Sequence, residues 1–83
     1  MTRVSSPGEL FGRAMREIRQ DKGLTQAQLS RRSGLTQARI SELESGVRMP
    51  NLLTVLRLAV ALDCTAADLV AVFDGADLAN LIK

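Results

Sequence analysis

Apolar residues recur at intervals of three and four along the chain, and no segment shows the apolar–polar alternation of a half-buried strand. Residues 6–9 read SPGE, a capping box with proline at the first helical position. A helix is therefore expected from residue 7, and Gly23 is expected to stop it. The apolar stripe of this helix consists of Leu10, Phe11, Ala14, Met15 and Ile18.

A short sequence echo follows this first helix. Residues 23–30 read GLTQAQLS and residues 34–41 read GLTQARIS. In each copy a glycine ends one helix, a leucine precedes the cap, a threonine caps the next helix, and an apolar residue completes a hydrophobic staple. The echo predicts helices over about residues 26–32 and 37–45. It indicates one capping solution used twice rather than a repeat protein, which needs longer periods and more copies.

The pattern continues in the second half of the chain. Asn51 is a good N-cap for a helix that runs to about Leu62. The residues expected to face inward in it are Leu52, Val55, Leu56, Ala59 and Leu62. After a break at residues 63–64, residues 65–68 begin a further helix whose apolar positions are Leu69, Val72 and Phe73. A last short helix is expected over residues 76–82.

The segment 25–44 is the part of this pattern that indicates a function. It contains two short helices joined by about four residues that include Gly34, the outline of a helix–turn–helix. Gly34 is expected in a left-handed conformation, which a side chain disfavours. Ile40 and Leu43 would anchor the second helix. Its opposite face is polar and would fit a DNA major groove about 12 Å wide; it consists of Gln37, Ala38, Ser41, Glu42 and Ser45.

Composition excludes several other functions. The 83 residues are 46% hydrophobic and 2% aromatic, which makes room for one small aliphatic domain. There is no histidine and a single cysteine, Cys64, so the chain lacks a histidine base, a histidine metal ligand and a disulfide framework. The sequence shows no phosphate-cradling glycine loop and no membrane-length apolar run. Residues 1–10 lack the apolar core expected of a secretory signal. We expect a cytoplasmic protein that is not an enzyme and binds no cofactor, metal, membrane or small molecule.

The net charge of +2 is unevenly distributed. Residues 1–48 carry nine basic and five acidic residues, so 9 − 5 = +4, whereas residues 49–83 carry two basic and four acidic residues, so 2 − 4 = −2. Nine of the eleven basic residues are arginines, which suit planar recognition of phosphate. Charge alone fits an ordinary solvated surface equally well.

At this point the sequence resembles the XRE-type, phage-repressor-like helix–turn–helix family, over roughly residues 10–70. The resemblance implies a compact, all-α, five-helix domain, which the helix pattern places over residues 7–73. Residues 1–6 are short and polar, and we expect them to form a flexible arm. Residues 74–83 are a C-terminal segment and a candidate for dimerisation. The positions that carry the resemblance are Ile18, Arg19, Lys22, Gly23, Leu24, Thr25, Gln26, Leu29, Gly34, Ile40, Leu43, Glu44, Gly46, Pro50, Asn51, Leu52, Ala61 and Leu62.

The resemblance also implies roles for single residues. Gln26 matches a residue that bonds the DNA backbone, and Arg48 matches a second backbone contact. Base-reading positions fall on Gln37, Ala38 and Glu42, which by their chemistry suit adenine, a thymine methyl group and cytosine N4. The alternatives are a plain helix-start role for the glutamines and a solvent-facing Glu42. The expected DNA-binding set is Gln26, Thr36, Gln37, Ala38, Arg39, Ser41, Glu42 and Arg48. Arg19 and Glu44 match positions that pair in an internal salt bridge, a structural role.

Departures from the family pattern raise further expectations. Ser30 replaces a usual alanine, and its hydroxyl is expected to bond the carbonyl of Gln26. Asp63 replaces a common glycine. Cys64 is expected to be a small buried apolar residue. Arg3 belongs either to an arm that enters a minor groove or, as we prefer, to a frayed terminus.

An extra apolar stripe is the last departure. Leu53 and Val60 occupy positions that are usually polar in the family, and with Arg57 and Cys64 they form an extra stripe on this helix. We expect residues 76–82 or a second subunit to cover the stripe. The candidate dimer residues are Leu53, Val60, Leu69, Phe73, Leu78, Leu81 and Ile82.

Two function classes follow from these observations. The first is a sequence-specific DNA-binding transcriptional regulator, a repressor or autoregulator, that binds a palindromic operator as a homodimer. The alternative is an antitoxin or coactivator-like module whose main partner is a toxin or another protein. Phage repressors, restriction–modification controllers and antitoxins all come in this size. The sequence leaves open the choice among them, the operator and the sign of regulation.

Overall fold

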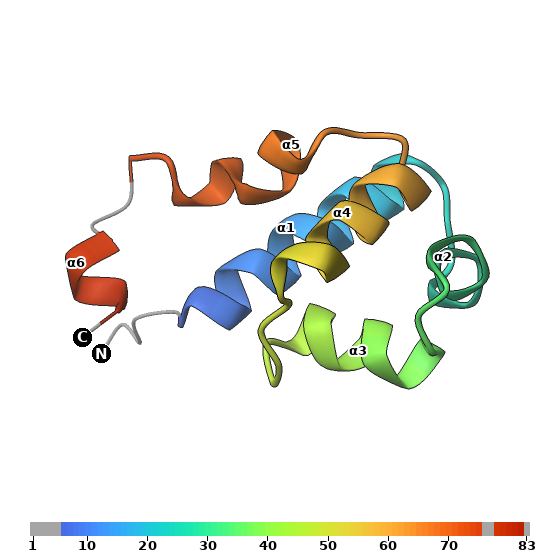
Figure 1. Ribbon diagram of the computed structural model, residues 1–83, viewed down its shortest axis with the longest axis horizontal. Helices are drawn as coiled ribbons and strands as arrows, with labels where there is room; N and C mark the ends of the chain where they lie inside the picture. Colours follow the sequence, from blue (N-terminus) through green and yellow to red (C-terminus); the bar gives the residue numbers. More distant parts are fainter. Residues whose placement is uncertain (1–5, 76–77, 83) are drawn as a thin grey trace.

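Capping residues set the starts of the helices. In each of five helices the N-cap side chain accepts a hydrogen bond from the backbone N–H three residues further on. The computed structural model describes residues 6–75 and 78–82. Its helices, shown in Figure 1, are α1 (Pro7–Asp21), α2 (Gln26–Ser33), α3 (Gln37–Ser45), α4 (Leu52–Ala61), α5 (Ala66–Val70), the 3-10 turn η1 (Ala71–Phe73) and α6 (Leu78–Leu81).

The all-α class is confirmed, since no strand occurs in the described part of the chain. The expected fifth helix is divided: α5 ends at Val70, and the chain tightens into η1 before the turn at Asp74. The arm proposed over residues 1–6 lies outside the described residues except for Ser6, which caps α1. Residues 76, 77 and 83 of the C-terminal segment also lie outside them.

The core forms where α1 to α5 meet. Its fully buried large side chains are Phe11, Met15, Leu29, Ile40, Leu43, Leu58, Leu62 and Leu69. Leu69 is therefore a core residue with 0% exposure, and its expected place in a dimer interface is wrong. Phe73 is half-buried and packs against the same core.

The inward face of α4 differs from the expected one. Leu52 and Leu56 are 72% and 47% exposed, whereas Leu58 is fully buried. Apolar residues cover nearly the whole circumference of this helix, so several rotations of it bury a continuous stripe. Its packing against α2 and α5 selects the rotation that buries Val55, Leu58 and Leu62 and turns Leu52 and Leu56 outward.

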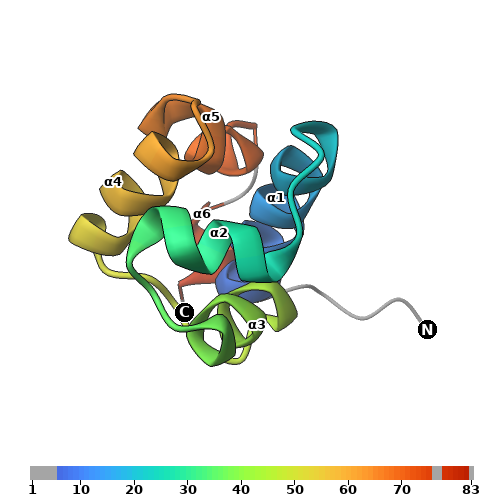
Figure 2. The ribbon, with the colours of Figure 1, turned by 90° about the vertical axis from the view of Figure 1, so that its right-hand side faces the viewer.

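Two glycines let α1 and α3 approach closely. A Cβ atom at Gly12 would lie 2.5 Å from the carbonyl oxygen of Glu44 and also against that of Leu43. A Cβ atom one turn earlier, at Gly8, would lie 2.8 Å from the carbonyl oxygen of Gly46. The C-terminal half of α3 thus rests directly on the backbone of α1, as Figures 1 and 2 show. No local pattern in the sequence indicates this contact.

Two of the turns with left-handed backbone bear on the sequence-based expectations. Gly34 has φ +77°, as expected for the turn between α2 and α3. Asp63, after α4, has φ +53° and is the only non-glycine residue with positive φ among those described. The glycine common at this position in the family therefore has a conformational reason. None of the described helices combines the length and apolarity needed to cross a membrane.

Candidate nucleic-acid interface

Helices α2 and α3 form the helix–turn–helix, and side chains of α2 fasten its turn. The Ser30 hydroxyl donates to the carbonyl of Leu35 at 2.5 Å, and the Leu35 N–H donates to the Ser33 hydroxyl at 3.2 Å. The expected bond from Ser30 to the Gln26 carbonyl is wrong, because the turn folds back and brings the Leu35 carbonyl within reach. Both serines thus help to fix the angle at which α3 leaves the turn.

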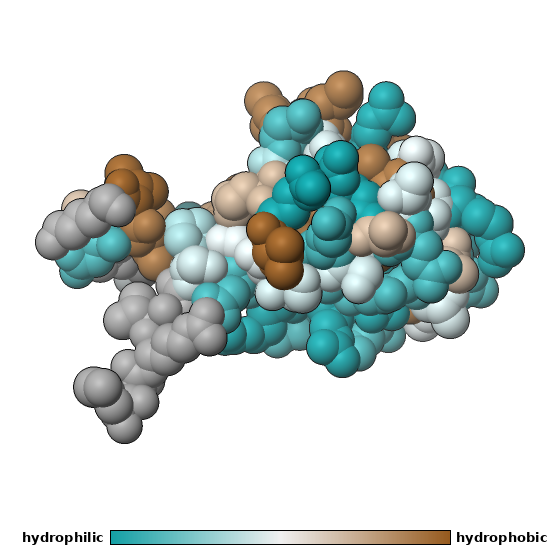
Figure 3. All heavy atoms as spheres, turned by 90° about the horizontal axis from the view of Figure 1, so that it is seen from below, coloured by the Kyte–Doolittle hydropathy of each residue, from teal (hydrophilic) through white to brown (hydrophobic). Residues whose placement is uncertain are grey.

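Helix α3 presents a polar face on a buried anchor. Ile40 and Leu43 have 0% exposure, while Gln37, Ala38 and Ser41 on the opposite face are exposed. The Thr36 hydroxyl accepts from the Arg39 N–H at 3.1 Å and so fixes the first turn. Seen from below in Figure 3, the surface on this side of the molecule is mainly hydrophilic. Helix α3 is therefore anchored in the core by its apolar face, and its small and polar side chains point outward.

Glu42 and Arg48 form an ion pair at the C-terminal side of this face. Arg48 Nε lies 3.5 Å from Glu42 Oε1, with side chains 51% and 39% exposed respectively. A pair this open to water contributes little to stability. The guanidinium does offset the negative charge of Glu42, which would otherwise lie uncompensated on the proposed phosphate-facing surface. Arg39, between Ala38 and Ile40, is half-buried.

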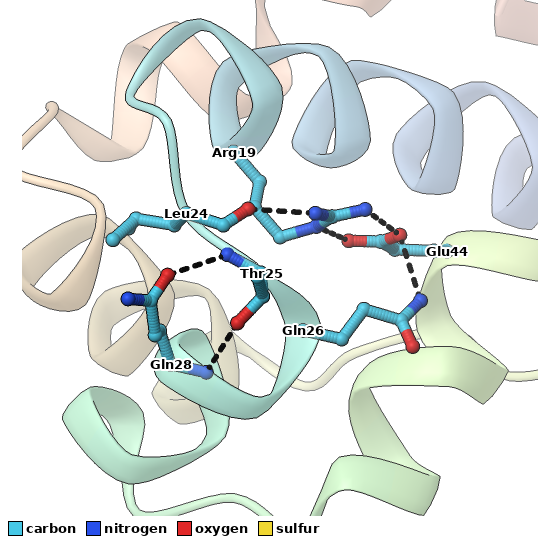
Figure 4. A network of polar contacts seen from close by, with 6 residues as sticks. All are labelled: Arg19, Leu24, Thr25, Gln26, Gln28 and Glu44. Atoms are coloured by element: carbon cyan, nitrogen blue, oxygen red, sulfur yellow. Dashed lines mark hydrogen bonds and ion pairs between the residues drawn. The ribbon is translucent and has the colours of Figure 1, made fainter.

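A buried polar network lies where α1, α2 and α3 meet (Figure 4). Arg19 Nε donates to Glu44 Oε2 at 2.6 Å, and Arg19 Nη2 donates to Glu44 Oε1 at 3.0 Å. The two side chains are 11% and 5% exposed. The hydrogen bond to Glu44 raises the pKa of Arg19 above its ordinary value. The salt bridge implied by the family resemblance is therefore present.

Gln26 is also part of this network. Its Nε2 donates to Glu44 Oε1 at 3.0 Å, so a residue expected to contact DNA is tied to the internal ion pair. Thr25, immediately before it, forms a reciprocal capping box with Gln28, with distances of 2.8 and 3.1 Å. Helix α2 thus begins with its cap and its first side chain both held in place. The link between Gln26 and Glu44 was not predicted, since the two residues lie 18 positions apart in the sequence.

The candidate dimer residues do not form one surface. Leu53 and Val60 project from α4 with 58% and 83% exposure. Leu78 and Ile82, of the C-terminal segment, are 52% and 77% exposed. No described residue covers the stripe on α4, and this includes residues 78–82 of the C-terminal segment. That expectation is wrong for a single subunit.

The residues that form the stripe on α4 differ from the expected ones. Leu53, Leu56, Arg57 and Val60, together with Arg32 and Ser33, line a shallow hollow of about 290 Å³. Cys64 lies elsewhere: it borders a hollow near the end of α1 that Ile18 and Lys22 also line. It is half-buried against the core, and burial raises the pKa of its thiol. In the part of the chain that the structure describes, no cluster of three or more His, Cys, Asp or Glu side chains could hold a metal ion.

This fold and this surface are those of a helix–turn–helix domain, and the helix–turn–helix family model matches residues 15–69. The chain belongs to this family. Over 66 residues it is 39% identical to the uncharacterized HTH-type transcriptional regulator y4dJ of Sinorhizobium fredii, covering 80% of this chain and 86% of that one.

Two solved structures are similar over most of their length. The restriction-modification controller protein C.AhdI from Aeromonas hydrophila is 39% identical, with a TM-score of 0.73, covering 75% of this chain and 94% of that one. The clp gene regulator ClgR from C. glutamicum is 28% identical, with a TM-score of 0.81, covering 89% and 96% respectively.

Proposed function

We propose that this protein is a transcriptional regulator that binds a specific DNA sequence as a homodimer, with α3 in the major groove. The observation that carries the proposal is the polar face of α3, held on buried Ile40 and Leu43. The names of the relatives, a transcriptional regulator, a controller protein and a gene regulator, support the same class of function. The function needs no catalysis, and a regulator of this kind acts in the cytoplasm.

Base reading is assigned to the first turns of α3. Gln37 and Ala38 are exposed there, and Glu42 lies about one turn later. A glutamine can bond adenine through two hydrogen bonds, an alanine can contact a thymine methyl group, and a carboxylate can accept from cytosine N4. We therefore assign sequence selectivity to these three side chains.

Backbone contacts are assigned to the flanks of α3 and to the start of α2. The first intrahelical bond of α2 runs from the Leu29 N–H to the Thr25 carbonyl, so the N–H groups of Gln26 and Ala27 precede the hydrogen-bonded ladder. Such groups at a helix N-terminus attract phosphate. Side chains that would add to this contact are Gln26, Thr36, Arg39, Ser41 and Arg48.

Dimerisation is assigned to the stripe on α4. In Figure 2 this helix lies at the left of the molecule, above and to one side of α3, and apolar side chains project from the upper edge of Figure 3, which corresponds to that side. A two-fold axis beside α4 therefore keeps both copies of α3 on the same side of the dimer. Such an arrangement presents them to half-sites about one DNA turn apart in a palindrome. The exposed side chains of Leu78 and Ile82, with Leu81, are a second surface proposed for the dimer.

The test begins with duplexes selected from a random library by the purified protein. Replacing Gln37 with alanine should weaken binding to the selected duplex by about 1–3 kcal/mol and relax one base position. The matched control is Gln20→Ala, an exposed glutamine on α1, which should leave binding unchanged. Equal weakening on every sequence would mean that Gln37 does not read a base.

One observation favours a second candidate function. The uncovered stripe of Leu53, Leu56 and Val60 also suits a partner protein, as in an antitoxin or coactivator-like module. Sedimentation of the purified chain separates the two proposals. A dimer at micromolar concentration supports the regulator. A monomer that becomes stably associated only with the product of a neighbouring reading frame, such as a toxin, supports the alternative.

A further inference from the structure

A single carboxylate joins the three helices that build the proposed DNA-binding surface. Glu44 of α3 accepts from Arg19 of α1 and from Gln26 of α2. We propose that Glu44 is a positioning residue for DNA binding: it holds the Gln26 amide ready to donate to a DNA phosphate. The inference rests on the proposed function and gives the Arg19–Glu44 pair a role beyond stability.

The geometry leaves Glu44 little freedom. Its Oε2 accepts from Arg19 Nε, and its Oε1 accepts from both Arg19 Nη2 and Gln26 Nε2. The guanidinium is held from its other side, since Arg19 Nη1 donates to the Leu24 carbonyl at 2.7 Å. With the carboxylate 5% exposed and bonded at both oxygens, the position of Oε1 is fixed relative to α1 and α2.

This fixed acceptor determines how the carboxamide of Gln26 is oriented. An amide has a donor end and an acceptor end, and only the donor end is attracted to a carboxylate. The contact therefore directs the NH₂ group of Gln26 towards Glu44. One of its two N–H bonds serves Glu44, and the second remains to donate to a phosphate oxygen, which only accepts. Gln26 is thus ordered before DNA arrives, so less side-chain entropy is lost on binding.

The ion pair also reduces the repulsion between the Glu44 carboxylate and a DNA phosphate. An unpaired carboxylate beside Gln26 would repel the phosphate that Gln26 is proposed to bind. Arg19 compensates this charge through two hydrogen bonds, so the carboxylate can accept from Gln26 without leaving a net negative charge at the phosphate site.

The test is a double-mutant cycle of Glu44→Gln and Gln26→Met, read as affinity for a short duplex of mixed sequence at low salt. A mixed sequence suffices because the contact is to the backbone. In Glu44→Gln an NH₂ group, which is a donor, replaces one carboxylate oxygen. The side chain can then no longer accept all three hydrogen bonds from Arg19 and Gln26. Gln26→Met removes the amide and keeps an unbranched side chain. The matched control, Glu17→Gln, makes the same change of charge at an exposed site on α1.

The expected result is coupling between the two sites. Glu44→Gln should weaken binding about three- to tenfold in the wild-type background. In the Gln26→Met background it should weaken binding no further. An equal loss in both backgrounds, after correction for the folded fraction, would overturn the inference. If the wild-type chain binds no duplex, the proposed function fails, and this inference fails with it.

A measurement on the unmodified chain covers the case in which Glu44→Gln does not fold. Side-chain amide relaxation in solution should show Gln26 more rigid than Gln20 and Gln37, which are exposed. Equal mobility of the three amides in the free protein would contradict preorganisation and overturn the inference.

Discussion

The exposed sides of α3 and α4 are opposite kinds of surface. On α3 the outward residues are small or polar, and the apolar ones, Ile40 and Leu43, are fully buried. On α4 apolar side chains point both inward and outward, and Leu53 and Val60 remain largely exposed. The face of α3 is suited to exchanging water for base edges and phosphates. The face of α4 gains free energy when covered, at about 25 cal/mol per Å² of apolar surface.

The contacts that hold the two helices against the rest of the domain differ as well. Helix α3 is fixed by backbone contact at Gly12 and by the Arg19–Glu44 pair. Helix α4 packs through buried side chains, chiefly those of Leu58 and Val55. Rigid placement matters for a surface that must match the geometry of DNA, whereas apolar contacts between subunits can adjust. Substitutions at the contacts of each helix test this division.

Removing the carboxylate of Glu44 should have the largest effect on stability. Glu44→Ala leaves Arg19 charged and deprived of its partner in a nearly buried site, at a cost of about 3–5 kcal/mol. Thermal unfolding followed by circular dichroism should show a melting temperature lower by several degrees or more. Glu17→Ala, at an exposed site on the same helix as Arg19, is the control. An unchanged melting temperature for Glu44→Ala would refute the structural role of the pair.

Adding a methyl group at the contact between α1 and α3 should have the next largest effect on stability. Helix propensity alone predicts that Gly12→Ala stabilises the protein by about 1 kcal/mol. The carbonyl of Glu44, 2.5 Å from the added Cβ, predicts instead a loss of about 3 kcal/mol, because two backbones must separate. Chemical denaturation gives the sign directly. Stabilisation would show that α3 does not rest on α1 in this way.

A charge placed on the outward face of α4 should separate folding from association. Val60→Lys lies at an 83% exposed site, so the free energy of unfolding of the monomer should change by less than about 0.5 kcal/mol. Dimerisation, measured by sedimentation, should weaken at least about tenfold, since burial of the ammonium group opposes it. Gln20→Lys adds the same charge at an exposed site on α1 and should leave the dimer intact. An unaffected dimer would exclude this face of α4 from the interface.

The smallest effect is expected at the turn after α4. Asp63 has φ +53°, a conformation that glycine adopts without strain. Asp63→Gly should raise the free energy of unfolding by about 0.5 kcal/mol, because relief of strain slightly exceeds the added entropy of the unfolded chain. Asp63→Ala, which keeps the Cβ atom and loses the tolerance of aspartate for this region, should lower it. Urea denaturation measures both free energies of unfolding. A lower value for Asp63→Gly than for Asp63→Ala would contradict the assigned backbone conformation.

Much of the fold follows from local signals in the sequence. Thr25, Thr36 and Asn51 start helices because their side chains cap the first turn, and Gly34 closes the turn between α2 and α3. These features depend on residues a few positions apart. The Arg19–Glu44 pair spans a longer distance, and the family resemblance rather than the local pattern indicated it.

What the sequence did not predict depends on how the helices pack. The rotation of α4 was ambiguous because that helix is apolar on most of its circumference. The burial of Leu69, the redirection of the Ser30 hydroxyl and the close approach at Gly12 arise only when separate helices meet. The bond from Gln26 to Glu44 belongs to the same class, since the two residues are 18 positions apart.

The proposed function requires that the polar face of α3 binds DNA while the outward face of α4 does not. Backbone amide chemical shifts of the labelled protein, recorded with and without a selected duplex, test it most directly. We expect the largest changes at Gln26, from Gln37 to Glu42, and at Arg48, with small changes at Leu53 and Val60. Changes concentrated on α4, or spread evenly over the molecule, would contradict it.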